Sequence, residues 1–278
     1  MSDAEGGDED LVVGQIVRRP AQFLPSVICW VDVLGVSDAL KAAACSGTEA
    51  TWAQRYAADL KSMHDRLSKD YSGSGFSWHV ISDAIVLSVP LAHDHPEFTT
   101  GYVFMDAAEA QFEFALKGRF MRGAITIGPL LVDGTVVVGS GLMRAQAIEA
   151  KEACFPRILV DDSIGSCLPE FLSYYSSSLV APQRLHLAVD ADDKVFVNYL
   201  YEAVESTDGD ANAVVKLLEK HRLVVEQQLK QHANNPKVLG KYEWVAQYHN
   251  WFCNNFLCPT MGRGLQIADI SARNFSKL

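Results

Sequence analysis

The sequence predicts an α/β sandwich of the α+β kind, with a ferredoxin-like core whose elements follow the order β-α-β-β-α-β. Short runs rich in β-branched residues alternate with longer stretches in which apolar residues recur at helical spacing. The order of these segments is that of a split β-α-β sandwich. The chain has 278 residues and is 49% hydrophobic, so it is long enough to bury a large core around this motif.

The first half of the core comprises one strand, a helical region and a hairpin. Residues 27–34 (VICWVDVL) predict a first strand that ends at Gly35. From Ser37 to residue 69 the apolar spacing is helical, as one broken helix or two successive helices. Residues 76–90 alternate around Ser82–Asp83 and predict two strands joined by a tight turn.

The second half begins with a long helix over 96–117. Residues 119–139 then predict a strand pair, because Asp133–Gly134 is a strong hairpin signal. A third helix over 140–153 and a strand over 156–162 elaborate the core. Two edge strands, a loop or linker and two C-terminal helices follow, over residues 185–189, 194–200, 205–213, 213–232 and 237–256. Residues 271–278 show no clear structural pattern.

Composition divides the chain into three parts. Residues 1–20 begin with MSDAEGGDED and predict a disordered acidic tail. Residues 21–205 hold the ferredoxin-like domain. Residues 206–278 form a helical extension that we expect to pack on the same domain, where the aromatic residues of WVAQYHNWF face either the sheet or a dimer partner.

The charge and cysteine content exclude several functional classes. A net charge of -10 and a pI of about 5.2 disfavour a nucleic-acid or anionic-membrane surface. No apolar run approaches a membrane span, and the N-terminus lacks the basic and apolar regions of a signal peptide. The six scattered cysteines have no metal-site spacing, so we expect them to be reduced and buried. These features predict a soluble cytoplasmic protein.

Two acidic residues interrupt apolar strand patterns. Asp32 lies within the first strand and Asp83 in the hairpin turn, with no Lys or Arg beside either in sequence. Each on its own is compatible with a helix cap or a turn residue. The two segments are neighbours in a ferredoxin-like sheet, however, so together the acids predict a divalent-cation site. A turn that presents backbone N–H groups to a phosphate follows the first acid, formed by Leu34, Gly35, Val36 and Ser37.

Four motifs resemble those of the class III nucleotide cyclase domain. They are WVDVLGVS, VISDAIVL, FMRGAITIGPL and VVVGSGLMRAQAIEA, in this order between residues 27 and 160. Ser82 stands where the family usually has Gly, and Ala145 and Glu149 match the end of its helix motif. The resemblance implies the cyclase fold, with residues 21–205 as the cyclase homology domain.

The resemblance also assigns roles to the acids and to one arginine. It implies that Asp32 and Asp83 ligate two divalent cations, Mg²⁺ or Mn²⁺, together with the backbone carbonyl of Val33. Arg122 matches the arginine that meets the β- and γ-phosphates, which suits a guanidinium; the alternative is a sheet arginine paired with a carboxylate. Lys194 is either a second phosphate cation or a solvated lysine.

The sequence departs from the family where purine cyclases read the base and stabilise the transition state. The transition-state Asn and Arg are replaced by Met143 and Ala147, and the base-reading Lys and its partner acid by His79 and Val136. The domain is therefore either an inactive homologue that binds a nucleotide or a partner protein, or a cyclase for another base.

Further residues favour a pyrimidine cyclase. Residues 139–158 and 241–252 resemble the pyrimidine cyclases of bacterial Pycsar anti-phage systems. This implies a homodimeric phosphorus–oxygen lyase that converts UTP, or less often CTP, into the 3′,5′-cyclic monophosphate, which a separate effector protein reads. His79, Arg144 and Gln146 are the candidate base or ribose contacts, although a structural histidine and two surface residues are the simpler interpretations.

Overall fold

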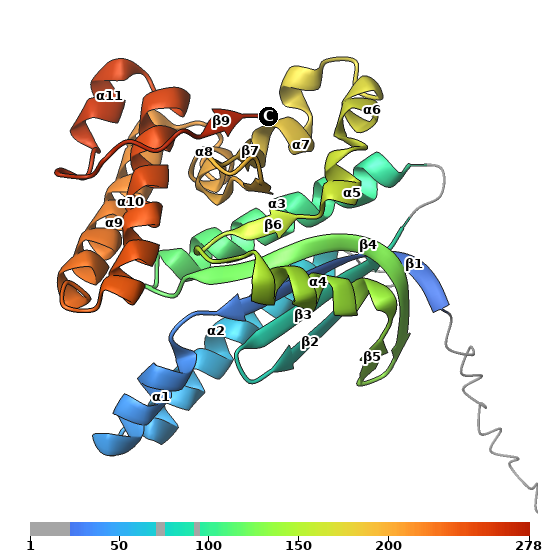
Figure 1. Ribbon diagram of the computed structural model, residues 1–278, viewed down its shortest axis with the longest axis horizontal. Coiled ribbons are helices and arrows are strands. Elements are labelled where there is room, and N and C mark those ends of the chain that lie inside the picture. The colour runs from blue at the N-terminus through green and yellow to red at the C-terminus, as the bar shows by residue number, and fades with distance from the viewer. Residues whose placement is uncertain (1–22, 71–75, 92–94) are drawn as a thin grey trace, which may run out of the picture.

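The computed structural model describes residues 23–70, 76–91 and 95–278, so the predicted tail over 1–20 lies outside the described residues. It is a mixed α+β protein with one nine-stranded sheet and helices on both faces (Figure 1). The strand order is β2-β3-β1-β4-β6-β8-β7-β9, and β5 pairs with β4. The strands are β1 Phe23–Val33, β2 Ser77–Ile81, β3 Ala84–Pro90, β4 Met121–Asp133, β5 Val136–Val138, β6 Ile158–Val160, β7 Leu187–Val189, β8 Val195–Val197 and β9 Ser276–Lys277.

The predicted ferredoxin-like core is confirmed. Strand β1 lies between β3 and β4 and is antiparallel to both, and β2 pairs with β3 at the edge. Two helices, α1 (Val36–Cys45) and α2 (Glu49–Asp70), connect β1 to β2, so the first helical region is two helices rather than one broken helix. Helix α3 (Pro96–Ala115) connects β3 to β4.

Alternating residues of β1 face two different layers. Val27, Val31 and Val33 are buried in the large core cluster with residues of α2 and α3. On the opposite face, Ile28 packs with Leu142 of helix α4 (Ser140–Lys151). A Cβ at Gly141 would lie 2.4 Å from Ile28 Cδ1 and 3.0 Å from the Cα of Gly128, so a glycine here lets α4 approach the strand backbone closely.

The segment between β6 and β7 contains short helices that the sequence pattern did not reveal, because four to six residues are too few to show helical periodicity. Residues 271–278 also contain a strand, β9. Since β9 pairs with β7, and β8 lies between β6 and β7, the prediction that both segments are edge strands was wrong. The helices of this half are α5 Asp162–Gly165, α6 Leu168–Ser173, η1 Ser178–Val180, α7 Pro182–Leu185, η2 Tyr199–Tyr201, α8 Glu202–Glu205, α9 Ala211–Gln231, α10 Pro236–Phe256 and α11 Pro259–Gly264.

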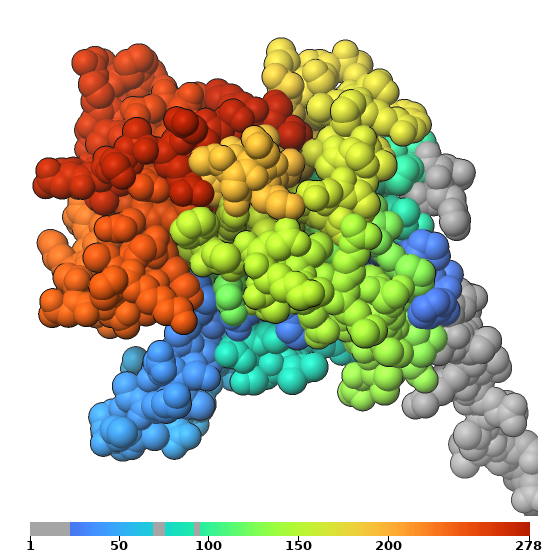
Figure 2. Space-filling view, viewed as in Figure 1, coloured from blue at the N-terminus to red at the C-terminus, as the bar shows by residue number. Residues whose placement is uncertain are grey.

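The aromatic residues of α10 pack on the sheet, which decides between the two predicted roles. The rings of Trp244 and Tyr248 lie 5.5 and 5.4 Å from that of Phe196 on β8, and both also contact Phe275 near the C-terminus. Figure 2 shows α9–α11 and the end of the chain as a lobe against the rest of the molecule.

A buried ion-pair network joins this lobe to the strands. Asp190, which follows β7, accepts hydrogen bonds from Arg157, from Trp244 Nε1 at 2.8 Å and from Arg273 Nε at 2.5 Å. Arg157 also binds Asp192. Arg157 and Asp190 are almost completely buried, so the network replaces the solvation that these charges lose on folding.

The cysteines are less buried than predicted. All six are free thiols, but only Cys29 and Cys253 are buried, while Cys45, Cys154 and Cys258 are exposed.

None of the helices in the described residues is long and apolar enough to cross a membrane.

Candidate active site

The two predicted acids lie at the same end of the sheet. Asp32 is the second-last residue of β1, opposite Ala84 of β3, and Asp83 is in the turn that precedes Ala84. The N–H of Val33 donates a hydrogen bond to the carbonyl of Asp83 at 2.9 Å. Ser82 has a left-handed φ of 62°, the conformation for which a glycine is favoured. The topology thus brings the two acids together, as the sequence predicted.

Arg122 bridges Asp32 to helix α4. It faces Asp32 across the β1–β4 ladder, and its Nε lies 3.1 Å from Asp32 Oδ2. Its Nη2 lies 2.7 Å from Glu149 Oε1. Burial raises the pKa of Glu149, while the Arg122 charge opposes this shift. In this structure Arg122 therefore pairs with two carboxylates, and Glu149, which the sequence offered only as the end of a motif, positions its guanidinium.

A lysine from α10 adds a cation that sequence reasoning missed. Burial lowers the pKa of Lys241, and the positive charges of Arg122 and Lys237 lower it further, whereas Asp32 raises it. Lys241 is therefore within electrostatic range of Arg122 and Asp32. The sequence feature that could have revealed this lysine is the spacing in KVLGK, which places Lys237 and Lys241 on one helical face.

Tyr56 of α2 is also electrostatically coupled to the two acids. Its pKa is raised to about 12, mainly by burial, with contributions from Asp83 and Asp32 and an opposing one from Arg119. The Arg119 guanidinium lies 5.0 Å from the Tyr56 ring centroid. The Tyr56 hydroxyl is buried and has no hydrogen-bond partner among the described residues.

The donor set fits a hard divalent cation. The Oδ2 atom of Asp32 pairs with Arg122, whereas the carboxylate of Asp83 makes no side-chain hydrogen bond or ion pair within the described chain. Both residues are partly exposed, and the Val33 backbone lies between them. Partly solvated carboxylates together with a backbone carbonyl are the oxygen donors that Mg²⁺ and Mn²⁺ accept.

The predicted phosphate turn is partly engaged within the protein. The N–H of Leu34 donates to the carbonyl of Phe120 at 2.8 Å. Gly35 has a φ of 80° and precedes α1 without a side-chain cap. The first N–H groups of a helix have no acceptor within it, so Val36 and Ser37 retain the features of a phosphate-binding turn and the amide of Leu34 does not.

The three base or ribose candidates lie in different places. His79 of β2 shares a sheet face with Trp30 and Asp32, because it is opposite Val86, which is opposite Trp30. Burial lowers the pKa of His79, and in the described part of the chain its buried Nε2 has no hydrogen-bond partner. Helical spacing places Gln146 and Arg144 on opposite flanks of α4.

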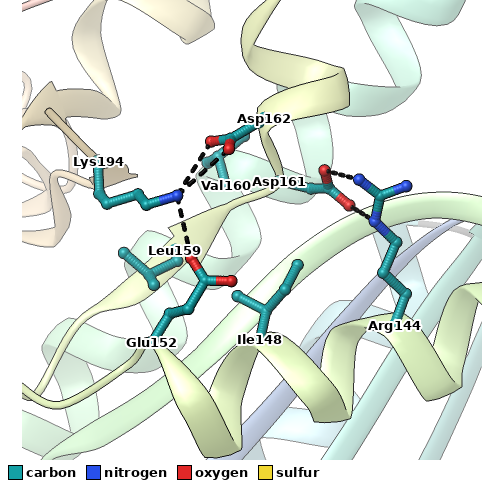
Figure 3. Close-up of a pocket in the computed structure, with 8 residues that line it drawn as sticks. All are labelled: Arg144, Ile148, Glu152, Leu159, Val160, Asp161, Asp162 and Lys194. Atoms are coloured by element: carbon teal, nitrogen blue, oxygen red, sulfur yellow. Dashed lines mark hydrogen bonds and ion pairs between the residues drawn. The ribbon is translucent and has the colours of Figure 1, made fainter.

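Arg144 and Lys194 belong to a separate polar cavity of about 140 Å³ next to α4 and β6 (Figure 3). Arg144 binds Asp161 there, with Nη2 2.6 Å from Oδ1. Lys194 Nζ lies 3.0 Å from Glu152 and 3.2 Å from Asp162. These ion pairs engage both cations within this cavity, and neither contacts Asp32 or Asp83.

No protein-family model and no curated protein matches the chain. Several solved structures do. The catalytic core of a rhodopsin-guanylyl cyclase with converted specificity, in complex with ATPalphaS, has 16% identity and a TM-score of 0.41, and the match covers 54% of this chain and 85% of that one. The adenylyl cyclase CyaB from P. aeruginosa has 11% identity and a TM-score of 0.38, with 55% and 84% covered. The monomeric guanylyl cyclase domain of RhoGC from the aquatic fungus Blastocladiella emersonii has 15% identity and a TM-score of 0.40, with 63% and 95% covered.

Proposed function

We propose that this chain is a metal-dependent pyrimidine nucleotide cyclase, which converts UTP, or CTP, into the 3′,5′-cyclic monophosphate and pyrophosphate. The observation that carries the proposal is the placement of two carboxylates, Asp32 and Asp83, beside the guanidinium of Arg122 at one end of the sheet, with Lys241 of α10 within electrostatic range. Carboxylates suit divalent cations, and a guanidinium with an ammonium suits the phosphate oxygens. A nucleoside triphosphate with bound Mg²⁺ needs both.

Each residue of the site has a defined role in this proposal. Asp32, Asp83 and the carbonyl of Val33 would hold two Mg²⁺ or Mn²⁺ ions. Ions held in this way stabilise both the attacking and the leaving oxygen of an in-line displacement. Arg122 and Lys241 would orient the triphosphate so that the ribose 3′-oxygen attacks the α-phosphorus and the bond to pyrophosphate breaks.

Arg122 has to exchange partners for this role. In the free protein its guanidinium is shared between Asp32 and Glu149. A phosphate group is negatively charged like these carboxylates and can accept two parallel hydrogen bonds from the guanidinium. Glu149 is nearly buried and belongs to α4, so we expect it to keep Arg122 at the rim of the site when Asp32 turns to the cation.

The pyrimidine assignment depends on what the site lacks. The positions that read and orient a purine in related cyclases hold His79, Val136, Met143 and Ala147. Val136 and Met143 are 55% and 69% exposed and offer no hydrogen bond to a base. His79 has an unpartnered ring nitrogen among the described residues, which suits one edge of a pyrimidine. The Pycsar resemblance supports an anti-phage second messenger that a separate effector reads.

A homodimer would cover the apolar surface beside α4. Strand β5 leads directly into α4, and its residues Val136 and Val138 are 55% and 51% exposed. Met143 of α4 is 69% exposed. Ile81 on the sheet face of Asp32 is 67% exposed. Exposed apolar side chains of this size are typical of an interaction surface, and a two-fold axis here would give two equivalent sites.

The second candidate is a catalytically inactive cyclase homologue that binds a nucleotide or a partner protein. The replacement of the transition-state pair by Met143 and Ala147 favours it.

Incubation of the purified protein with each of the four ribonucleoside triphosphates and Mn²⁺, followed by mass spectrometry, separates the two candidates. We expect cyclic UMP or cyclic CMP, which disappears in Asp32→Ala and Asp83→Ala and persists in the control Asp38→Ala, an exposed acid of α1. Cyclic AMP alone would contradict the pyrimidine assignment. No product from any triphosphate would contradict the enzyme and favour the inactive homologue.

A further inference from the structure

A second cluster of metal-binding side chains lies far along the chain from Asp32 and Asp83. His186 follows α7, and Glu202 and Glu205 belong to α8, where their spacing of three places them on one face. One potential ligand atom from each of these three residues lies within 4.8 Å of the other two.

The imidazole of His186 is buried and contacts a carboxylate of the same cluster. It is 1% exposed, and neither ring nitrogen has a hydrogen-bond partner among the described residues, although Nε2 lies 2.5 Å from Glu205 Oε2. The edge of its ring packs against Tyr201, with centroids 5.3 Å apart. Nδ1 has neither a hydrogen bond nor an ion pair within the described residues, and an unpaired buried polar atom is costly. A ligand at this ring would therefore stabilise it.

The charges around the cluster are unbalanced. Glu202 is influenced by the negative charges of Glu109, Glu205 and Asp106. Arg66 opposes them, but it is itself paired with Glu109 at 2.6 Å. Among the described residues, no arginine or lysine forms an ion pair with Glu202 or Glu205, so both carboxylates are available to a cation.

We propose that His186, Glu202 and Glu205 bind one first-row divalent transition-metal ion, at a site separate from Asp32 and Asp83. One imidazole nitrogen and two carboxylates form a donor set that Zn²⁺ accepts, whereas Mg²⁺ and Ca²⁺ prefer oxygen ligands alone. The inference is independent of the cyclase proposal, since none of these three residues takes part in that chemistry.

The site has an entry path. A cavity of about 310 Å³ borders His186 and Glu205 and is lined by side chains from α3, including Phe98, Tyr102 and Met105. Three protein ligands leave a fourth position for water or an exogenous ligand. Because His186 and Glu205 border this cavity, an ion held by them would be reached through it without unfolding of the chain.

Metal binding to the full-length protein tests this site directly. The Asp32→Asn/Asp83→Asn double variant removes the other predicted cation site and serves as the background. After treatment with a chelator, Zn²⁺ is titrated in competition with a chromophoric chelator. We expect one equivalent to bind, and Glu205→Gln to weaken binding more than about 100-fold, beyond the loss caused by changes outside the coordination sphere. Glu170→Gln, at an exposed residue of α6, is the matched control and should bind as its parent does.

Co²⁺ absorption supplies a readout that a purely structural role would not change. Co²⁺ in the background variant should show the visible bands of a site with nitrogen and oxygen ligands, and Glu205→Gln should lose them. The Glu205 side chain is 38% exposed, so this variant should unfold like its parent when no metal is present. Absence of bound Zn²⁺ in the background variant, or equal affinity in Glu205→Gln, would overturn the proposal.

Discussion

Asp190 gives the most direct test of how the C-terminal lobe is held to the sheet. Its Oδ2 accepts hydrogen bonds from Arg157 and Trp244 Nε1, and its Oδ1 from Arg273 Nε and the N–H of Ala191. In Asp190→Asn one of these oxygens becomes an NH₂ group. In either orientation of the amide, two of the four groups that donate to Asp190 then face the NH₂ group and lose their hydrogen bond. The buried Arg157 also loses its buried counter-charge.

The expected loss follows from the interactions that are removed. A hydrogen bond to a charged group contributes about 1.5–3 kcal/mol, and two are lost in either orientation. Arg157 keeps its bond to Asp192, which offsets part of the loss. Removing one partner of a buried ion pair lowers the free energy of unfolding by about 3–5 kcal/mol. We therefore expect the free energy of unfolding to fall by about 3–5 kcal/mol.

Asp192→Asn is the matched control, because Asp192 binds the same guanidinium but its side chain is 45% exposed. An exposed partner contributes about 1 kcal/mol or less. Urea unfolding, followed by circular dichroism for both variants at the same pH and salt, measures the difference. A loss below about 1 kcal/mol in Asp190→Asn, or equal losses in the two variants, would refute the reasoning.

Three further predictions concern the core and the site. Burial lowers the pKa of His221 and of His249, the latter to about 4, so below pH 6.5 the unfolded chain binds protons that the folded chain does not. The free energy of unfolding should not depend on these residues above pH 6.5 and should fall by up to about 1.4 kcal/mol per pH unit per histidine toward pH 4. If urea unfolding shows that His249→Gln loses stability with falling pH as steeply as its parent, the prediction is contradicted. Gly141→Ala should cost about 1–3 kcal/mol through overpacking against Ile28 Cδ1, 2.4 Å from the added Cβ, and Ile28→Val in the same chain should restore part of it in thermal unfolding. Arg122→Lys loses the bidentate geometry and should lower cyclase activity about 10- to 100-fold, whereas Lys41→Arg on α1 should leave it unchanged.

Local patterns in the sequence were sufficient for the core. The run of strand-forming apolar residues over 27–34 and the alternation around Ser82–Asp83 predicted strands that the structure confirms. Once the β-α-β-β-α-β order was established, the proximity of Asp32 and Asp83 followed, because ladder pairing in this topology makes β1 and β3 neighbours. Short segments escaped prediction: a helix of four residues has no periodicity, and β9 has only two residues.

The charge partners of the site were decided by tertiary packing alone. Arg122 pairs with Glu149 because α4 lies on that face of the sheet, and Lys241 is within electrostatic range of Asp32 because α10 docks through Trp244. Arg144, a candidate base or ribose contact, pairs with Asp161. Backbone periodicity determines which face a residue lies on. Which charges meet across that face depends on how distant elements pack, and sequence spacing does not encode this.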